Sequence, residues 1–248
     1  MADTYVVSDV HGHLADLHGE LETAGLVDAE GRWTGDDATL WILGDLTDRG
    51  PDGIGVIRLV RSLQEQVPEQ VRVLLGNHEA LMIGYRLFPD SRFSEVWFIN
   101  GGHESDQEAL TDDDLAWLRA LPAMASDGRR LFVHSDTTDY LEWGSSLDEV
   151  NATVQRLLGG DDADEHFSVF AGLTSRYDFA REDGAEAAAR MLETFGGETI
   201  VHGHSIIGTL VDKPSYAIDG PITYADGRVV AIDGGRYDGG PLLLVRLP

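Results

Sequence analysis

The 248-residue chain contains no cysteine. This absence excludes disulfide bonds, thiolate nucleophiles and cysteine-ligated zinc sites. Any metal ion must therefore be bound through nitrogen and oxygen ligands. A chain without cysteine is also compatible with a reducing compartment, and we expect a cytoplasmic protein.

Basic residues are scarce, with 18 Lys and Arg against 44 Asp and Glu, which gives a formal net charge of −26. A nucleic-acid backbone requires clustered Lys and Arg, so we expect no nucleic-acid partner. Such an acidic surface mainly favours solubility. It repels anionic substrates at long range, but bound divalent cations reverse that repulsion locally.

Long hydrophobic runs are also missing. No segment approaches the roughly 18–20 consecutive apolar residues that a membrane-spanning helix needs. The N-terminal sequence MADTYVVSDVHG has no basic region followed by an apolar stretch, so we predict no signal peptide and no membrane partner. The composition, with 42% hydrophobic residues, is that of a globular protein and does not indicate an oligomeric state.

The first ninety residues alternate between short apolar runs and helical patterns. Strands are predicted at 4–8, 39–43 and 71–75, and helices at 13–24, 54–63 and 79–87. This alternation predicts an α/β layer with parallel strands. We find no internal repeat and no linker, so residues 1–248 are predicted to form one domain.

The rest of the chain predicts a fourth strand after the first three, a helical segment and a β-rich end that suits a second sheet. Thr111 precedes three aspartates and an apolar pattern, as in an N-capped helix. A fourth strand is expected at 131–133, and a mostly helical, cap-like segment at about 135–197. Short strands are then predicted at 199–201, 209–211, 222–224, 229–232 and 242–245. These elements favour two sheets enclosed between helical layers.

Polar residues follow four successive predicted strands. Asp9 and His11 end the first strand, Asp45 the second, Asn77 the third and His134 the fourth. In open α/β sheets, ligands bind beyond the carboxyl ends of the strands, so we expect these side chains to meet at one edge. Each motif has an ordinary alternative, such as a helix cap or a buried structural histidine. The combination favours a functional site.

These residue types suit two metal ions. A pair of divalent cations about 3.5–4 Å apart needs a bridging carboxylate. Asp45 is the candidate, because the preceding Gly44 allows a sharp backbone turn. Imidazole nitrogens together with hard oxygen ligands favour manganese, with iron or zinc as alternatives.

The motifs D-x-H, G-D-x-x-D-R-G, G-N-H-E, a single His and G-H-S occur in this order from Asp9 to Ser205. Together they resemble the calcineurin-like metallophosphoesterase superfamily. GDLTDRGPD and LLGNHEAL are similar to its phosphoprotein phosphatase branch, close to bacterial and phage enzymes. The resemblance implies a four-layer αββα sandwich of two mixed β-sheets flanked by helices.

The resemblance also implies roles for single residues. Asp9, His11 and Asp45 would bind the first metal, and Asp45, Asn77, His134 and His204 the second. His78 would be the general acid and Asp48 would orient it. The two arginines, Arg49 and Arg176, would bind the phosphoryl group. A metal-bridging hydroxide would attack phosphorus in line.

Some of these assignments leave alternatives open. Arg49 could form a salt bridge with Asp48 or Asp52, and Arg176 could belong to a surface ion pair. The loop 100–104 resembles one that borders the substrate pocket, although His103 could simply be solvated. After His134 the superfamily usually continues with Ala-Gly, whereas this chain has Ser-Asp-Thr-Thr. This departure concerns the shape of the loop and the substrate preference.

The function that the sequence favours is a metal-dependent serine/threonine protein phosphatase or phosphomonoester phosphatase. Its partners would be phosphorylated proteins or small phosphoesters. The alternative is a bis(5'-nucleosyl)-tetraphosphatase-like pyrophosphohydrolase, and a non-enzymatic metal-bound scaffold ranks third. A scaffold would have no need of His78, Asp48 and Arg49. Aromatic residues at 140–179 could bind adenine, but such positions are more often part of a core.

Overall fold

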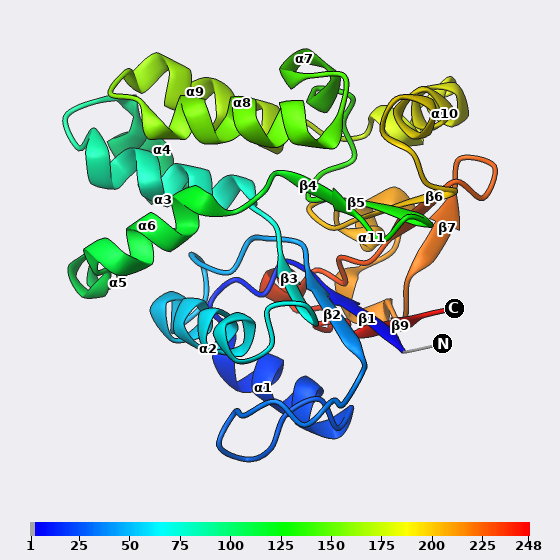
Figure 1. Ribbon diagram of the computed structural model, residues 1–248, viewed down its shortest axis with the longest axis horizontal. Helices are drawn as coiled ribbons and strands as arrows, with labels where there is room; N and C mark the ends of the chain where they lie inside the picture. Colours follow the sequence, from blue (N-terminus) through cyan, green and yellow to red (C-terminus); the bar gives the residue numbers. More distant parts are fainter. Residues whose placement is uncertain (1–2) are drawn as a thin grey trace.

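The computed structural model describes residues 3–248, so Met1 and Ala2 of the predicted domain lie outside the described residues. Two β-sheets lie at the centre of the molecule (Figure 1). The first has the order β3-β2-β1-β9. Its strands are β1 (Thr4–Val7), β2 (Thr39–Ile42), β3 (Val71–Val73) and β9 (Val245–Leu247). The first three are parallel, as predicted, and β9 is antiparallel to β1.

The second sheet has the order β4-β5-β6-β8-β7. Its strands are β4 (Met124–Ser126), β5 (Arg130–Val133), β6 (Thr199–His202), β7 (Ile222–Tyr224) and β8 (Val229–Ala231). The three central strands run parallel, and the outer strands β4 and β7 are antiparallel to their neighbours. Both sheets are therefore mixed.

Alternating side chains along the strands separate the layers. Trp41 of β2 and Phe132 of β5 stack with ring centroids 4.0 Å apart, and Val6 and Val201 belong to the same buried cluster between the sheets. Ile42, which follows Trp41 in β2, faces the other side of the sheet and joins the larger core that the helices cover. This two-residue period is what a strand buried on both faces requires.

We expect Phe132→Ala to lower the free energy of unfolding by about 3–5 kcal/mol, because truncation leaves a cavity between two sheets that cannot close on it. Phe132 is fully buried, whereas Phe98 is 45% exposed and provides the matched control as Phe98→Ala. Urea denaturation of both variants measures the difference. Equal losses in the two variants would contradict the inter-sheet packing described here.

Helices cover the outer faces of both sheets (Figure 1). α1 (Leu14–Thr23) and α2 (Gly53–Gln66) pack on the first sheet, where Leu17 and Val60 join its core. α8 (Leu147–Gly159) and α10 (Gly184–Phe195) contact strands of the second sheet. The arrangement is the four-layer αββα sandwich that the resemblance implied, and this prediction is confirmed.

Further helices lie beside the sandwich. They are α3 (Asn77–Leu87), α4 (Arg92–Ile99), α5 (Glu104–Ala109), α6 (Asp112–Ala120), α7 (Tyr140–Trp143) and α9 (Ala163–Thr174). The predicted cap at Thr111 is present, since its Oγ1 accepts a hydrogen bond from Asp114 N at 3.1 Å. The segment 135–197 is mostly helical, as predicted. That it acts as a cap stays a prediction.

The predicted strands differ from the structure in several details, and β4 was not predicted. Residues 209–211 were expected as a strand, but the chain forms the short helix α11 (Ile207–Leu210) there, because the amides of residues 209–211 donate back to the carbonyls of Ile206 and Ile207. The last strand lies at 245–247 rather than 242–245. The strand at 131–133 belongs to the second sheet rather than the first.

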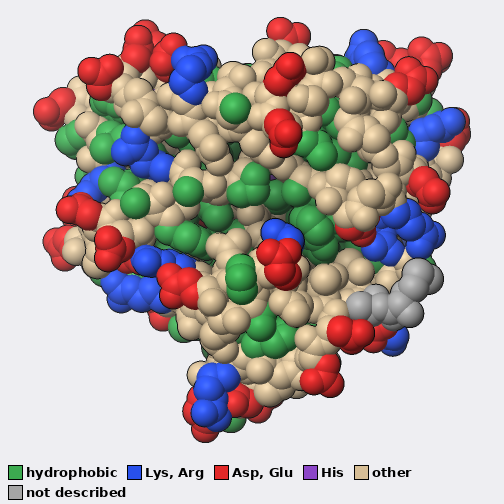
Figure 2. All heavy atoms as spheres, viewed as in Figure 1, with side chains coloured by type: hydrophobic (Ala, Val, Ile, Leu, Met, Phe, Trp, Pro, Cys, Tyr) green, Lys and Arg blue, Asp and Glu red, His purple; other side chains and the backbone are tan. Residues whose placement is uncertain are grey.

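Figure 2 shows acidic side chains mostly around the periphery of one face and apolar side chains across its middle. The negative charge is therefore spread out on this face rather than gathered in one patch. None of the helices within residues 3–248 combines the length and apolar character needed to cross a membrane.

Candidate active site

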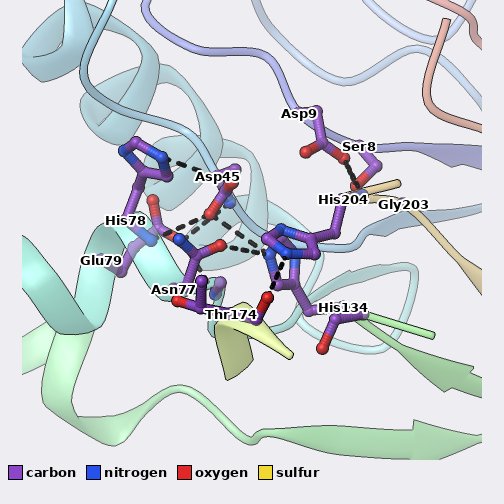
Figure 3. A network of polar contacts seen from close by, with 12 residues as sticks. Ser8, Asp9, Asp45, Asn77, His78, Glu79, His134, Thr174, Gly203 and His204 are labelled. Carbon is purple, nitrogen blue, oxygen red and sulfur yellow. Dashed lines mark hydrogen bonds and ion pairs between the residues drawn. The ribbon is translucent and has the colours of Figure 1, made fainter. Parts of the chain in front are cut away.

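The predicted site residues converge from both sheets. Asp9 and His11 follow β1, Asp45 follows β2, and Asn77 begins α3 after β3. His134 follows β5 and His204 follows β6, so these two come from the second sheet. The expectation of a single sheet edge was therefore wrong in detail. The carboxyl ends of the two sheets meet, and Figure 3 shows Asp45 among the side chains that converge there.

The backbone at these strand ends adopts conformations that side chains rarely take. Positive φ angles of 46–67° occur at Asp9, His11, Asp45, Asp48, Arg49 and His204. Left-handed non-glycine residues are uncommon and tend to gather at functional sites. Gly44 has φ of +91°, and a Cβ there would lie 2.4 Å from Gly76 N. The glycine thus permits the sharp approach to Asp45 that the sequence indicated.

Three imidazoles share one arrangement. In each, one ring nitrogen lies within hydrogen-bond distance of a backbone carbonyl: His11 Nδ1 and Thr47 O at 3.0 Å, His134 Nδ1 and Leu43 O at 2.8 Å, and His204 Nε2 and Thr174 O at 3.0 Å. The carbonyl fixes the protonated nitrogen, so the other nitrogen keeps a lone pair that can accept a hydrogen bond or bind a metal. This is the arrangement by which proteins orient histidine ligands for metals.

The lone-pair nitrogens and carboxylates form two groups. One contains His11, Asp45 and His78, the other Asp45, His134 and His204, and the possible ligand atoms in each group lie within 4.8 Å of one another. Asp45 belongs to both groups, as the bridging role requires. His11 Nε2 lies 3.6 Å from Asp45 Oδ2, and His134 Nε2 lies 3.4 Å from Asp45 Oδ1.

Asp9 and Asn77 complete the predicted ligand set. Asn77 Oδ1 lies 2.9 Å from His134 Nε2. Asp9 Oδ1 lies 4.0 Å from His11 Nε2, while its Oδ2 accepts bonds from Ser8 Oγ at 2.5 Å and His204 N at 2.8 Å. All six predicted ligands are at most 6% exposed. This set of imidazole nitrogens and hard oxygens fits a pair of first-row divalent ions.

Burial dominates the electrostatics of these groups. It lowers the pKa of His11 and His204 well below the usual value and also lowers the pKa of His134. Burial, and then the neighbouring Asp9 carboxylate, raises the pKa of Asp45. Neutral imidazoles are the form that binds metals, and a divalent cation would favour the charged carboxylate.

His78 differs from the other imidazoles, because its Nδ1 faces a carboxylate, Asp48 Oδ2, at 2.7 Å. Asp48 Oδ1 accepts a second bond from Trp97 Nε1 at 3.0 Å, which fixes the carboxylate in place. Both His78 and Asp48 are fully buried. Burial raises the pKa of Asp48 to about 7 and lowers the pKa of His78. In this desolvated site burial therefore disfavours the charged form of both side chains.

Arg49 reaches into the same site. Its guanidinium lies 3.3 Å from His11 Nε2 and 3.1 Å from His78 Nε2, and it stacks over the Tyr237 ring at 3.7 Å. The alternative of a salt bridge is not seen, since Asp48 bonds His78 and Trp97, and Asp52 caps α2 through Gly55 N.

The second arginine and the 100–104 loop also lie close to the site. Arg176 lowers the pKa of His78 and His204, although burial is the main cause in both. Its Nε donates to Thr174 O, and no carboxylate of the described chain pairs with it. Arg49 N donates to Gly101 O at 2.7 Å, which places the 100–104 loop against the arginine.

Sequence reasoning missed the role of Glu79. Its carboxylate accepts bonds from Asp45 N and Leu46 N, both at 2.8 Å, and from Gly76 N at 2.9 Å. The side chain thereby fixes the backbone that presents Asp45. Its place in the G-N-H-E motif was the available signal, but that motif does not reveal the partner. Burial raises the pKa of Glu79 to about 7.

Residues 3–208 match the model of the calcineurin-like phosphoesterase family. A symmetrical bis(5'-nucleosyl)-tetraphosphatase of Pectobacterium carotovorum is 33% identical over 166 residues, covering 64% of this chain and 51% of that protein. The chain thus spans about half the length of the curated relatives it matches.

Two solved structures share the fold at low identity. A cold-active protein-tyrosine phosphatase of a Shewanella species has a TM-score of 0.73 at 19% identity, covering 100% of this chain and 75% of that one. A serine/threonine phosphatase from Saccharomyces cerevisiae has a TM-score of 0.60 at 15% identity, covering 94% and 67%. With the family model matching residues 3–208, this chain belongs to the calcineurin-like phosphoesterase family of metal-dependent phosphoric ester hydrolases.

Proposed function

We propose that the chain is a metal-dependent phosphoester hydrolase that acts on serine/threonine phosphoproteins or on small phosphomonoesters. The observation that carries this proposal is the set of three buried imidazoles, each tied by one nitrogen to a backbone carbonyl and each in a group of possible metal ligands that includes Asp45. Such a set has the composition and orientation of a metal centre. We propose manganese as the working ion, with iron or zinc as alternatives.

The proposed ligands divide by their position around Asp45. Asp9, His11 and Asp45 would hold one ion, and Asp45, Asn77, His134 and His204 the other. When bound, the two ions would supply a hydroxide for in-line attack on phosphorus and offset the charge of the phosphoryl oxygens. Every other step of the proposed mechanism falls to side chains of the chain itself.

Arg49 is positioned to bind the phosphoryl group. Its planar guanidinium offers two parallel donors, which in the structure point to the Nε2 atoms of His11 and His78. Stacking on Tyr237 limits the rotation of this side chain. We propose Arg176 as a second phosphate contact, since it lies near His78, which Arg49 also contacts, and has no carboxylate partner among residues 3–248.

His78 is proposed as the general acid. With Asp48 holding its Nδ1, Nε2 is the atom that can carry a proton to the departing oxygen. A proton on Nε2 cannot coexist with the bond that Arg49 donates to the same atom. Protonation of His78 would therefore release that arginine toward the phosphate. A non-enzymatic scaffold would not require this buried pair, which argues against the third interpretation.

A nucleotide pyrophosphohydrolase is the second candidate, favoured by the name of the Pectobacterium relative. Burial argues against three of the aromatics considered for adenine binding, because Tyr140, Phe170 and Phe179 are core residues, while Trp143, Phe167 and Tyr177 are partly buried. Exposed apolar side chains instead lie at the end of α4, where Phe98 is 45% and Ile99 75% exposed, just before the loop that contacts Arg49. Such a surface suits a peptide better than a polyphosphate.

The remaining expectations are proposals as well. We propose one phosphoesterase domain in which residues 135–197 act as a cap over the site. The cysteine-free composition supports a cytoplasmic location. The deficit of basic residues supports a protein or small-molecule partner rather than a nucleic acid.

Parallel assays distinguish these substrates. Manganese-loaded protein is expected to hydrolyse an aryl phosphate and a phosphoserine peptide, and to lose this activity on chelation and regain it with manganese, because the ions supply the nucleophile. Diadenosine tetraphosphate is the third substrate in the panel. A preference of about a hundredfold for it would establish the second candidate. Full turnover by thoroughly metal-stripped protein would refute both.

A further inference from the structure

We propose that Asp136, Ser205, His202 and Tyr224 act as positioning residues that hold His134 and His204 at the spacing of one bound ion. This inference rests on the proposed function, since it concerns the second of the two proposed ion sites. None of the four is a proposed ligand or touches the proposed substrate position. All are buried except Tyr224, which is partly buried.

The first contact joins the loops that deliver the two histidines. Ser205 Oγ donates to Asp136 Oδ1 at 2.5 Å. Ser205 directly follows His204, and Asp136 lies two residues after His134. The bond between them therefore links the loops that follow β5 and β6, past the last backbone pair of the two strands. Gly203 N reinforces it by donating to His134 O at 3.0 Å. A charge-assisted bond in a desolvated site is stronger than an ordinary one.

The second contact fixes the other side of His204. His202 Nε2 lies 2.7 Å from the Tyr224 hydroxyl, and His202 Nδ1 lies 2.7 Å from Gly203 O. A carbonyl oxygen only accepts, so Nδ1 carries the proton of the neutral His202 ring and Nε2 accepts from the Tyr224 hydroxyl. Burial, and then the nearby Asp136 carboxylate, raises the pKa of Tyr224 well above its usual value. His204 is thus held on both flanks.

Strain at His204 explains why such support is needed. The residue has φ of 61°, a left-handed conformation that costs of order 1–3 kcal/mol unless its surroundings determine it. A Cβ on Gly203 would lie 1.9 Å from Ser8 Oγ, so this turn also packs closely against the first sheet. In the Ser-Asp-Thr-Thr sequence after His134, Asp136 occupies the position where the superfamily usually has glycine. Its carboxylate accepts the hydrogen bond from Ser205, which a glycine could not do.

One carboxylate oxygen of Asp136 is not used by the bond from Ser205. Asp136 Oδ2 is buried and no hydrogen bond satisfies it within the described chain, although the Tyr224 hydroxyl lies near the same carboxylate. An unpaired buried carboxylate oxygen is costly to stability and is retained where function requires it. We therefore expect Asp136 to contribute more to ion binding than to folding.

The test measures manganese binding to metal-stripped protein by isothermal titration calorimetry. Ser205→Ala and Asp136→Ala are expected to weaken one of two binding phases by about 10–100-fold, as loss of an orienting partner does, and to leave the other unchanged. His11→Asn identifies the phases, because it removes the first site only. At saturating manganese the kcat of both variants should return to within a few-fold of the parent value.

Two further variants keep the inference falsifiable. Asp136→Asn retains an acceptor for Ser205 and is expected to restore most of the lost affinity, even if Asp136→Ala folds poorly. Ser126→Ala is the matched control, since its hydroxyl bonds Arg130 O at 2.8 Å at the opposite end of β5. Melting temperatures and circular dichroism verify folding in each case.

The outcomes separate this inference from the proposed function. Unchanged affinity in both phases for Ser205→Ala and Asp136→Ala would overturn the positioning role while leaving the hydrolase intact. An equal loss in both phases would also overturn it, because it would show a general structural effect. A parent protein that binds no manganese would instead refute the proposed function itself.

Discussion

Asp45→Asn is expected to lower kcat/KM by about 10³-fold or more, since it removes the carboxylate common to both proposed ion sites. Transition-state stabilisation by a metal centre amounts to several kcal/mol, and each 1.36 kcal/mol corresponds to a tenfold change in rate. The fold should persist. An asparagine keeps the Oδ1 that accepts from His78 N at 3.0 Å, and the bond from the residue 45 amide to Glu79 is unaffected.

Metal content and kinetics together test this prediction. Elemental analysis should find fewer than two ions bound to Asp45→Asn under conditions that load the parent protein. Asp52→Asn provides the matched control, because Asp52 caps α2 through Gly55 N and asparagine caps a helix equally well. Retention of both ions with activity within tenfold of the parent would exclude Asp45 as the bridge.

The second large effect is expected for His78→Asn, and it should depend on the leaving group. A positioned general acid contributes about 10²–10⁴-fold when the departing oxygen needs a proton. Hydrolysis of a phosphoserine peptide should therefore fall by that factor, while an aryl phosphate with an acidic phenol should lose much less. Asp48→Asn should change activity in the same direction and by less, because it removes only the partner that orients Nδ1.

A series of substituted phenyl phosphates provides the measurement, with the slope of log kcat against phenol pKa as the readout. The slope should become steeper in His78→Asn. An equal loss for every leaving group would instead identify His78 as a metal ligand, which its place in the group with His11 and Asp45 also permits. His166→Asn is the control, since His166 is buried in α9 and bonds Gly160 O, away from the proposed site.

The sequence predicted the sandwich well where periodicity was strong. The β-α alternation of the first ninety residues and the position of α2 follow directly from apolar spacing. It failed at 209–211, because a run of three residues does not distinguish a strand from one helical turn. The amides of residues 209–211 bond the carbonyls of Ile206 and Ile207 in one helical turn, which the local sequence does not reveal.

The candidate site divides in the same way. Residues at strand ends, such as Asp9 and Asp45, could be predicted because the chain order of strands and polar residues carries the information. The sheet to which His134 belongs could not, since local sequence does not encode which strands pair. Glu79 and Asp136 act through partners 33 or more residues away, and no local pattern indicates contacts of that kind.

The origin of the ligands in two separate sheets has a mechanical consequence. Asp9, His11 and Asp45 move with the β1–β2 side of the molecule, and His134 and His204 with the β5–β6 side. A cation pair coordinated by both groups would link the two sheets and stabilise them against separation. Separation of the sheets would then be coupled to ion release, and hydrogen exchange at the amides after Asp45 and His134 would report both events together.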